Sequence, residues 1–107
     1  MDDPRKIARI FKALSVDTRV EILQLLKEQV LCVGALAARL DVSSAAVSQH
    51  LRILRNADLV VPEKRGNFVH YRVNEETLAE WRAVADDLLT AAGENEETKE
   101  LKDRGRR

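Results

Sequence analysis

The chain has 107 residues and a formal net charge of zero, with 45% apolar, 34% charged and 4% aromatic residues. This length supports one domain with one modest core, and the composition is typical of a soluble, helix-rich protein. There is one cysteine, no apolar run of membrane-spanning length and no apolar segment near Met1, so the sequence excludes an internal disulfide and predicts a cytoplasmic protein without a membrane partner.

The N-terminal part of the chain predicts two amphipathic helices. An apolar stripe at helical spacing opens the chain and consists of Ile7, Ile10, Phe11 and Leu14. This stripe predicts a first helix over residues 4–13. We expect Ser15 to cap the second helix and Asp17 to lie in its first turn. The apolar face of this second helix consists of Ile22, Leu23, Leu25 and Leu26, which predicts that it forms the centre of the core.

Residues 36–56 predict two helices separated by a tight turn. Leu36 and Leu40 lie one helical turn apart, and the pattern then breaks at Asp41. Aspartate tolerates the left-handed backbone that ends a helix, and the hydroxyl of Ser43 can cap the next helix, which should begin near Ser44. The buried stripe of that helix is predicted to be Val47, Leu51 and Leu54.

The opposite face of this helix is small and polar. Its members are Ser44, Ala45, Ser48, Gln49 and Arg52. Hydroxyls and an amide without bulk suit a helix end that enters the major groove of DNA, where glutamine can pair with adenine and the positive helix end favours phosphate. Ser43 and His50 complete the predicted DNA-contacting set in this region. The alternative is an ordinary helical hairpin whose polar face meets only water.

The pattern of apolar residues changes from helical to strand-like spacing after Asn56. Residues 59–65 and 68–73 are rich in β-branched and aromatic residues and flank Gly66-Asn67, which predicts a β-hairpin with Pro62 on an edge strand. A helix-turn-helix followed by such a hairpin predicts a mainly α fold with a small β-hairpin, namely a winged helix-turn-helix of five helices and a two-stranded wing.

Basic residues at the tip of this hairpin are the second candidate contact with DNA. Lys64 and Arg65 are placed to lie along the phosphate backbone, although charge at a hairpin tip also serves solubility. Residues 43–73 contain five basic and two acidic side chains, a balance of +3, whereas residues 75–92 contain one basic and five acidic side chains, a balance of −4. A phosphate backbone can orient a chain with this polarity, so zero net charge does not exclude double-stranded DNA as the partner.

The last predicted helix begins after Asn74, which can cap it, and ends before Gly93. Its apolar stripe consists of Leu78, Trp81, Ala85, Leu88 and Leu89. We therefore predict a single domain over residues 1–93 and a polar, mobile tail over residues 94–107.

Several motifs, in order, resemble the ArsR/SmtB transcriptional repressors of bacteria. Residues 11–23 are similar to the opening of that family, except that Val16-Asp17 replaces the usual Asp-Pro. Residues 43–54 resemble its recognition helix, residues 55–60 the segment after it, and residues 66–73 its wing. The resemblance implies a homodimeric repressor that binds an inverted-repeat operator and leaves it when an effector binds. It also implies a dimer interface made by the terminal helices, here Ile7, Ile10, Phe11, Leu78, Trp81, Ala85 and Leu88; alternatively, these residues close the core of a monomer.

The resemblance breaks at the metal sites of the family. Thiolate-type members carry two cysteines separated by one residue. Here Cys32 occupies the first of these positions, and Gly34 occupies the second. The family's other common metal site lies on the last helix. The matching positions here are Glu75, Thr77, Leu88 and Ala91, and of the family's metal ligands only the acidic residue is present. We therefore predict no metal and no cofactor, and an unknown effector that is a small molecule or, less readily, oxidation of Cys32.

No nucleophile with a neighbouring base and no glycine-rich phosphate loop occurs in the sequence, so we do not expect an enzyme. The competing interpretation is a winged helix that binds another protein and never contacts DNA. Such a surface should be apolar or aromatic, whereas Ser44, Ser48 and Gln49 are neither.

Overall fold

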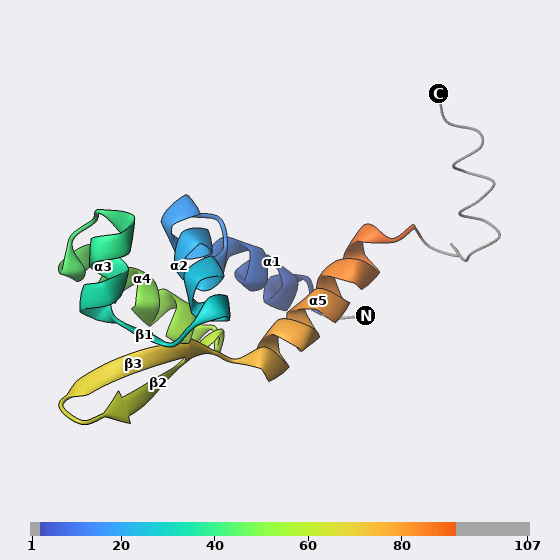
Figure 1. Cartoon of the computed structure of the whole chain (residues 1–107). Coiled ribbons are helices and arrows are strands. Elements are labelled where there is room, and N and C mark those ends of the chain that lie inside the picture. The colour runs from blue at the N-terminus through green and yellow to red at the C-terminus, as the bar shows by residue number, and fades with distance from the viewer. Residues whose placement is uncertain (1–2, 92–107) are drawn as a thin grey trace.

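The structure is a computed structural model and describes residues 3–91. These residues form five helices and a small sheet (Figure 1), in the order α1 (Pro4–Ala13), α2 (Asp17–Glu28), β1 (Leu31–Cys32), α3 (Val33–Leu40), α4 (Ser44–Asn56), β2 (Val60–Arg65), β3 (Phe68–Val73) and α5 (Glu75–Leu89). The predicted winged helix-turn-helix fold is confirmed. None of the helices described here combines the length and the apolar composition of a membrane span. The predicted polar tail over residues 94–107 lies outside the described residues.

The core lies where α2, α3 and α4 meet the sheet. Its most deeply buried side chains are Ile22, Leu36, Val47, Leu51, Leu54, Leu59 and Val60. Burying one aliphatic side chain of this size stabilises a fold by about 1.5–3 kcal/mol relative to leaving it exposed. The apolar stripe predicted for α4 is therefore confirmed, and Ile22 lies at the centre of the core as expected for α2.

The corner between α1 and α2 differs from the prediction. Val16 occupies the N-cap position of α2, but no side chain makes a capping hydrogen bond there. Ser15 does not cap it, because the helix begins at Asp17 and Ser15 lies one residue before the N-cap position. The hydroxyl of Ser15 donates a 2.7 Å hydrogen bond to the carbonyl oxygen of Lys12, back in α1. The end of α1 is closed by Arg19, whose Nε donates to the carbonyl oxygen of Ala13 at 2.8 Å and whose Nη2 donates to that of Lys12 at 3.3 Å.

The sheet is antiparallel and has the strand order β1-β3-β2. Leu31 pairs with Tyr71, and Arg65 pairs with Phe68 at the hairpin end. The strand β1 was not predicted, because two residues are too few to show an alternating pattern. Pro62 lies on β2, an edge strand, as predicted. Gly66 has a φ of 60° and Asn67 has no positive φ, which is the pattern of a two-residue type II′ hairpin turn.

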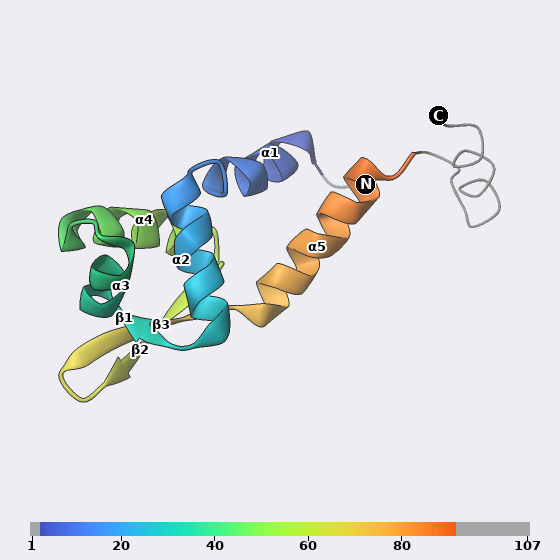
Figure 2. The same cartoon turned by 45° about the horizontal axis from the view of Figure 1, so that its top comes forward.

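The helix α5 extends away from the sheet and lies beside α1 (Figures 1 and 2). Asn74 caps it, as predicted, by accepting a 3.3 Å hydrogen bond at Oδ1 from the backbone N–H of Thr77. Thr77 and Val84 are its buried residues, whereas Leu78 and Trp81 pack against the core and are partly buried. The far end of the predicted stripe is uncovered in the single chain, because Leu89 is 76% exposed.

Candidate nucleic-acid interface

A tight turn joins α3 to α4 and sets the angle between them. Asp41 ends α3 in the left-handed conformation, with φ 54° and ψ 47°. The backbone N–H groups of Asp41 and Val42 both donate to the carbonyl oxygen of Ala37, which satisfies the end of α3. The stop that the sequence predicted at Asp41 is therefore confirmed.

The N-terminal end of α4 carries an uncompensated partial positive charge. Ser43 has an extended backbone, and its Oγ accepts a 3.0 Å hydrogen bond from the backbone N–H of Ala46. No acidic residue lies in the first turn, and Arg55 lies in the last. Helix dipoles place partial positive charge at this end, and the remaining N–H groups of the first turn point outward. Such an end attracts a phosphate group.

The polar side chains predicted to read DNA lie together on the outside of α4. The exposed members of the set are Ser43, Ser44, Ala45, Ser48, Gln49 and Arg52. His50 differs from them, because it is half-buried and its Nδ1 is buried with no hydrogen-bond partner among the described residues. His50 thus lies at the margin of this surface, and the other six residues form its centre.

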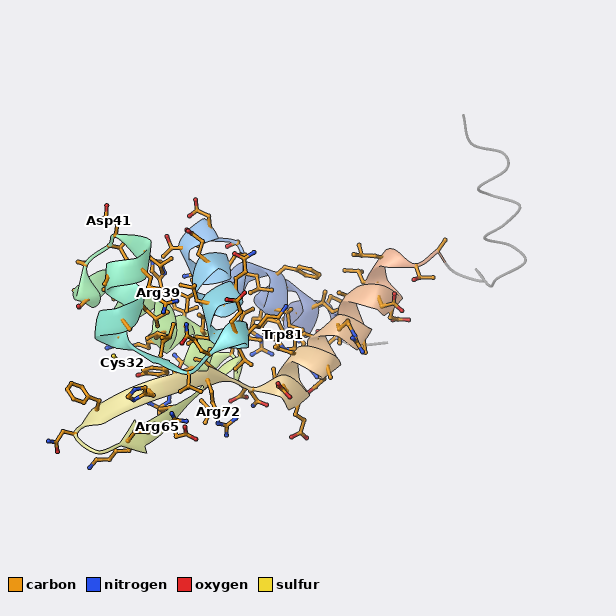
Figure 3. The ribbon with its side chains drawn as sticks, in the orientation of Figure 1. Cys32, Arg39, Asp41, Arg65, Arg72 and Trp81 are labelled. Atoms are coloured by element: carbon orange, nitrogen blue, oxygen red, sulfur yellow. The ribbon has the colours of Figure 1, made fainter. Side chains whose placement is uncertain are left out.

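The wing supplies exposed basic side chains that are partly neutralised within the hairpin. Lys64 and Arg65 are exposed. Arg65 contacts Oε2 of Glu63, with its Nε at 2.9 Å and its Nη2 at 2.8 Å, and Arg72 Nε lies 3.7 Å from Oε1 of the same carboxylate. Figure 3 shows Arg65 and Arg72 on the same side of the hairpin. Sequence reasoning missed this cluster, although the two-residue spacing of Glu63 and Arg65 places both on one face of a strand.

The wing and the reading end of α4 lie at the same end of the molecule. In Figures 1 and 2 the start of α4 and the tip of the β2–β3 hairpin are both far from α1 and α5. A helix end of this polarity fits the major groove, and a basic hairpin beside it fits the flanking phosphate backbone. The N-terminal end of α4 and the tip of the wing thus lie at one end of the described part of the molecule, and α1 and α5 lie toward the other.

The residues predicted to form a dimer interface lie on α1 and α5 and differ in exposure. Ile10 is only 5% exposed and already belongs to the interior of its own chain, whereas Phe11 is 40% and Leu88 46% exposed. The remaining members are partly buried, namely Ile7, Leu78, Trp81 and Ala85.

Cys32, the candidate for oxidation, is half-buried. It lies on β1 opposite His70 and immediately before α3 (Figure 3).

Comparison with known proteins gives consistent matches. Residues 17–61 match the model of the bacterial regulatory protein arsR family. The chain is 41% identical over 75 residues to the cadmium resistance transcriptional regulatory protein CadC homolog of Staphylococcus aureus, covering 69% of this chain and 62% of that protein. It is 41% identical over 80 residues to the arsenical resistance operon repressor of Escherichia coli (strain K12), covering 74% of this chain and 68% of the repressor.

The fold is also similar to a solved structure described as the homodimeric winged helix-turn-helix DNA-binding domain of Mb0332 from Mycobacterium bovis, a possible ArsR-family transcriptional regulator. The TM-score is 0.66 at 26% identity, and the match covers 89% of this chain and 96% of that one.

Proposed function

The chain belongs to the arsR family of bacterial regulatory proteins and is a DNA-binding transcriptional regulator, and from this premise we propose that it is a homodimeric repressor. In this proposal two copies of α4 bind the half-sites of an inverted-repeat operator and block transcription until an effector releases them. Repression by occlusion needs no second domain, in keeping with the single domain that we propose over residues 1–93.

The observation that carries the proposal is the outer face of α4. Ser44, Ser48 and Gln49 offer hydrogen-bonding groups, no Lys, Arg, Asp or Glu lies in the first two turns of the helix, and Ser43 caps its N-terminus. Base edges in the major groove are read by groups of this kind, and glutamine can hydrogen-bond adenine at two atoms. The wing then supplies Lys64 and Arg65 for the phosphate backbone, which adds affinity without sequence preference.

Dimer formation is supported by what the single chain leaves uncovered. Phe11 on α1 and Leu88 and Leu89 on α5 are large apolar side chains that remain exposed. In a two-fold dimer these surfaces would face one another, and the two α4 helices would meet successive major grooves about 34 Å apart. The solved relative from M. bovis is itself described as homodimeric.

We propose further that the effector is not a metal bound through thiolates. Cys32 is the only cysteine of the chain, and Gly34 stands where a second thiolate would be needed. Within residues 3–91 no group of three or more His, Cys, Asp or Glu side chains is arranged to hold a metal ion. One equivalent of zinc or arsenite is therefore expected to leave the operator complex intact. Release by either ion from the wild-type protein, but not from a Cys32→Ser variant, would show that Cys32 is a ligand.

The decisive experiment is a fluorescence-anisotropy titration of labelled duplex DNA from the promoter of the protein's own operon. Random duplex of equal length serves as competitor at a fixed salt concentration. A repressor of this kind should bind the promoter at least about a thousandfold more tightly than random DNA. Equal affinity for the two duplexes, or no binding to either, would contradict the proposal and favour a protein-interaction module.

A further inference from the structure

A cavity of about 620 Å³ lies between α1, the C-terminal end of α4 and the first half of α5. This volume is within the range of sites that hold small molecules. Its apolar lining comes mainly from Ile10, Ala13 and Ile53, together with the ring of Trp81, which Figure 3 shows where α5 passes the helices of the core. The cavity is distinct from the DNA surface, because it is lined by the opposite end of α4 from Ser43.

Arg19 is the unusual residue of this cavity. It lines the cavity and is only 8% exposed, yet within residues 3–91 no carboxylate lies within 4.0 Å of its guanidinium. Its two hydrogen bonds go to the neutral carbonyl oxygens of Lys12 and Ala13. Burying a cation is unfavourable unless an opposite charge compensates it, and a guanidinium has five N–H donors, of which these bonds use two. A carboxylate would supply the missing charge and accept further hydrogen bonds.

The rest of the lining has the same charge preference. Lys6, Arg9 and Lys12 lie around the cavity with Arg19, whereas only Asp58 and Glu80 are acidic, a balance of four basic against two acidic side chains, or +2. Glu80 is already engaged, because its Oε1 lies 3.3 Å from Nζ of Lys6. An anion in this cavity would therefore meet a net positive surface at its rim and a buried guanidinium in its wall.

We propose that this cavity binds a small aromatic carboxylate and that its binding lowers the affinity of the protein for its operator. The carboxylate pairs with Arg19 and with Arg9 of the rim, and the ring packs on Trp81 and Ile10. The ligand class follows from the combination of one strong anion site with an aromatic and aliphatic wall. The regulatory half of the proposal rests on the proposed repressor function.

The cavity is placed to affect both DNA binding and assembly. Ile53 and Asn56 are part of the same helix whose other end carries Ser44 and Gln49, and Trp81 is on α5. A ligand bound between these helices favours the arrangement of α4 and α5 for which its affinity is higher. Changing the angle of α4 relative to α5 alters the spacing of the two reading ends in a dimer, and the operator fixes that spacing.

The test uses the whole 107-residue chain and the fluorescence of Trp81, its only tryptophan. Benzoate and phenylacetate are titrated in the absence of DNA, and benzamide is the uncharged control. We expect at least one of the two anions to change the fluorescence saturably at micromolar to millimolar concentration, and benzamide to have no comparable effect. No saturable change with any of them overturns the proposed site, because the cavity is then closed or filled by the second copy of the chain.

Matched charge variants locate the binding. Arg9→Gln removes a cation from the rim and should weaken binding about tenfold, the share of one charged hydrogen bond. Arg82→Gln makes the same change of charge on an exposed part of α5 that does not line the cavity and should leave the dissociation constant unchanged. Equal effects of the two variants would overturn the assignment. Arg19→Lys should weaken binding further, but Arg19 also holds the end of α1, so the decision rests on the first pair.

A second measurement separates this inference from the proposed function. The anion that binds is added to the complex of the protein with its promoter DNA, and we expect the apparent affinity for DNA to fall. If fluorescence shows that the anion binds but the affinity for DNA does not change, the regulatory half of the proposal is overturned and the binding site stands. Absence of promoter binding even without the anion would instead contradict the repressor proposal.

Discussion

Replacing Ser43 by aspartate should separate the stability of α4 from its contact with DNA. The Oγ of Ser43 accepts a 3.0 Å hydrogen bond from Ala46, so Ser43→Ala removes a cap and should cost about 1 kcal/mol of the free energy of unfolding. Ser43→Asp retains an acceptor and places a negative charge at the positive end of a helix whose first turn has no acidic residue. This change should preserve stability or raise it by about 0.3–1 kcal/mol.

The same carboxylate would repel DNA. Two unit charges about 4 Å apart in bulk water interact by about 1 kcal/mol, so repulsion of one phosphate in each protomer costs about 2 kcal/mol per dimer. The operator complex of Ser43→Asp should then be roughly thirtyfold weaker, and that of Ser43→Ala much less affected. Urea unfolding measures stability, and anisotropy titration measures affinity. Normal operator binding by Ser43→Asp would refute the placement of the α4 N-terminus near phosphate, and equal losses in both variants would assign the effect to the cap.

Three further outcomes are expected. Gln49→Ala should reduce discrimination between operator and random DNA by about 1–3 kcal/mol in a competition titration, and an equal loss on both duplexes would show that Gln49 does not read bases. Glu63→Gln should free Arg65 and Arg72 from their ion pairs, tighten DNA binding a few-fold and make its salt dependence steeper. A weaker complex would show that the wing does not contact DNA. Gly34→Ala should raise the free energy of unfolding, measured in urea, by about 0.5–1 kcal/mol. The reason is that Gly34 lies within α3, which begins at Val33, and that nothing lies within 4 Å of an added Cβ. A lower free energy of unfolding would mean that α3 rearranges.

The features that the sequence predicted are those set by neighbouring residues. The stop at Asp41, the cap at Ser43 and the turn at Gly66 each depend on the conformational preferences of one or two residues, and all three were confirmed. The buried stripe of α4 followed from its period alone. Local preference and final structure agree at these points because no distant partner is needed to satisfy them.

The features that the sequence did not predict depend on partners elsewhere in the chain or on the exact residue at which a helix begins. The strand β1 exists only because Leu31 and Cys32 pair with β3, about 40 residues later. Ser15 had the right chemistry for a cap, but α2 begins at Asp17, so Val16 occupies the N-cap position and the hydroxyl of Ser15 donates to the carbonyl oxygen of Lys12. The burial of Arg19 was invisible to a search for apolar periodicity, since a charged residue at a buried position reads as part of the solvated face.

The uneven burial of α5 links assembly to DNA binding. Thr77 and Val84 are covered by their own chain, whereas Leu88 and Leu89, one turn further on, are exposed. A helix end with few packed side chains has little stability of its own, because most helical stability in proteins comes from tertiary packing of the apolar face. If a second copy covers this end, forming the dimer and ordering the last turn of α5 occur together. One protomer presents a single α4 helix and a single wing, so only the dimer can bind both half-sites at once. Operator affinity should therefore fall steeply once the protein is diluted below its dimer dissociation constant.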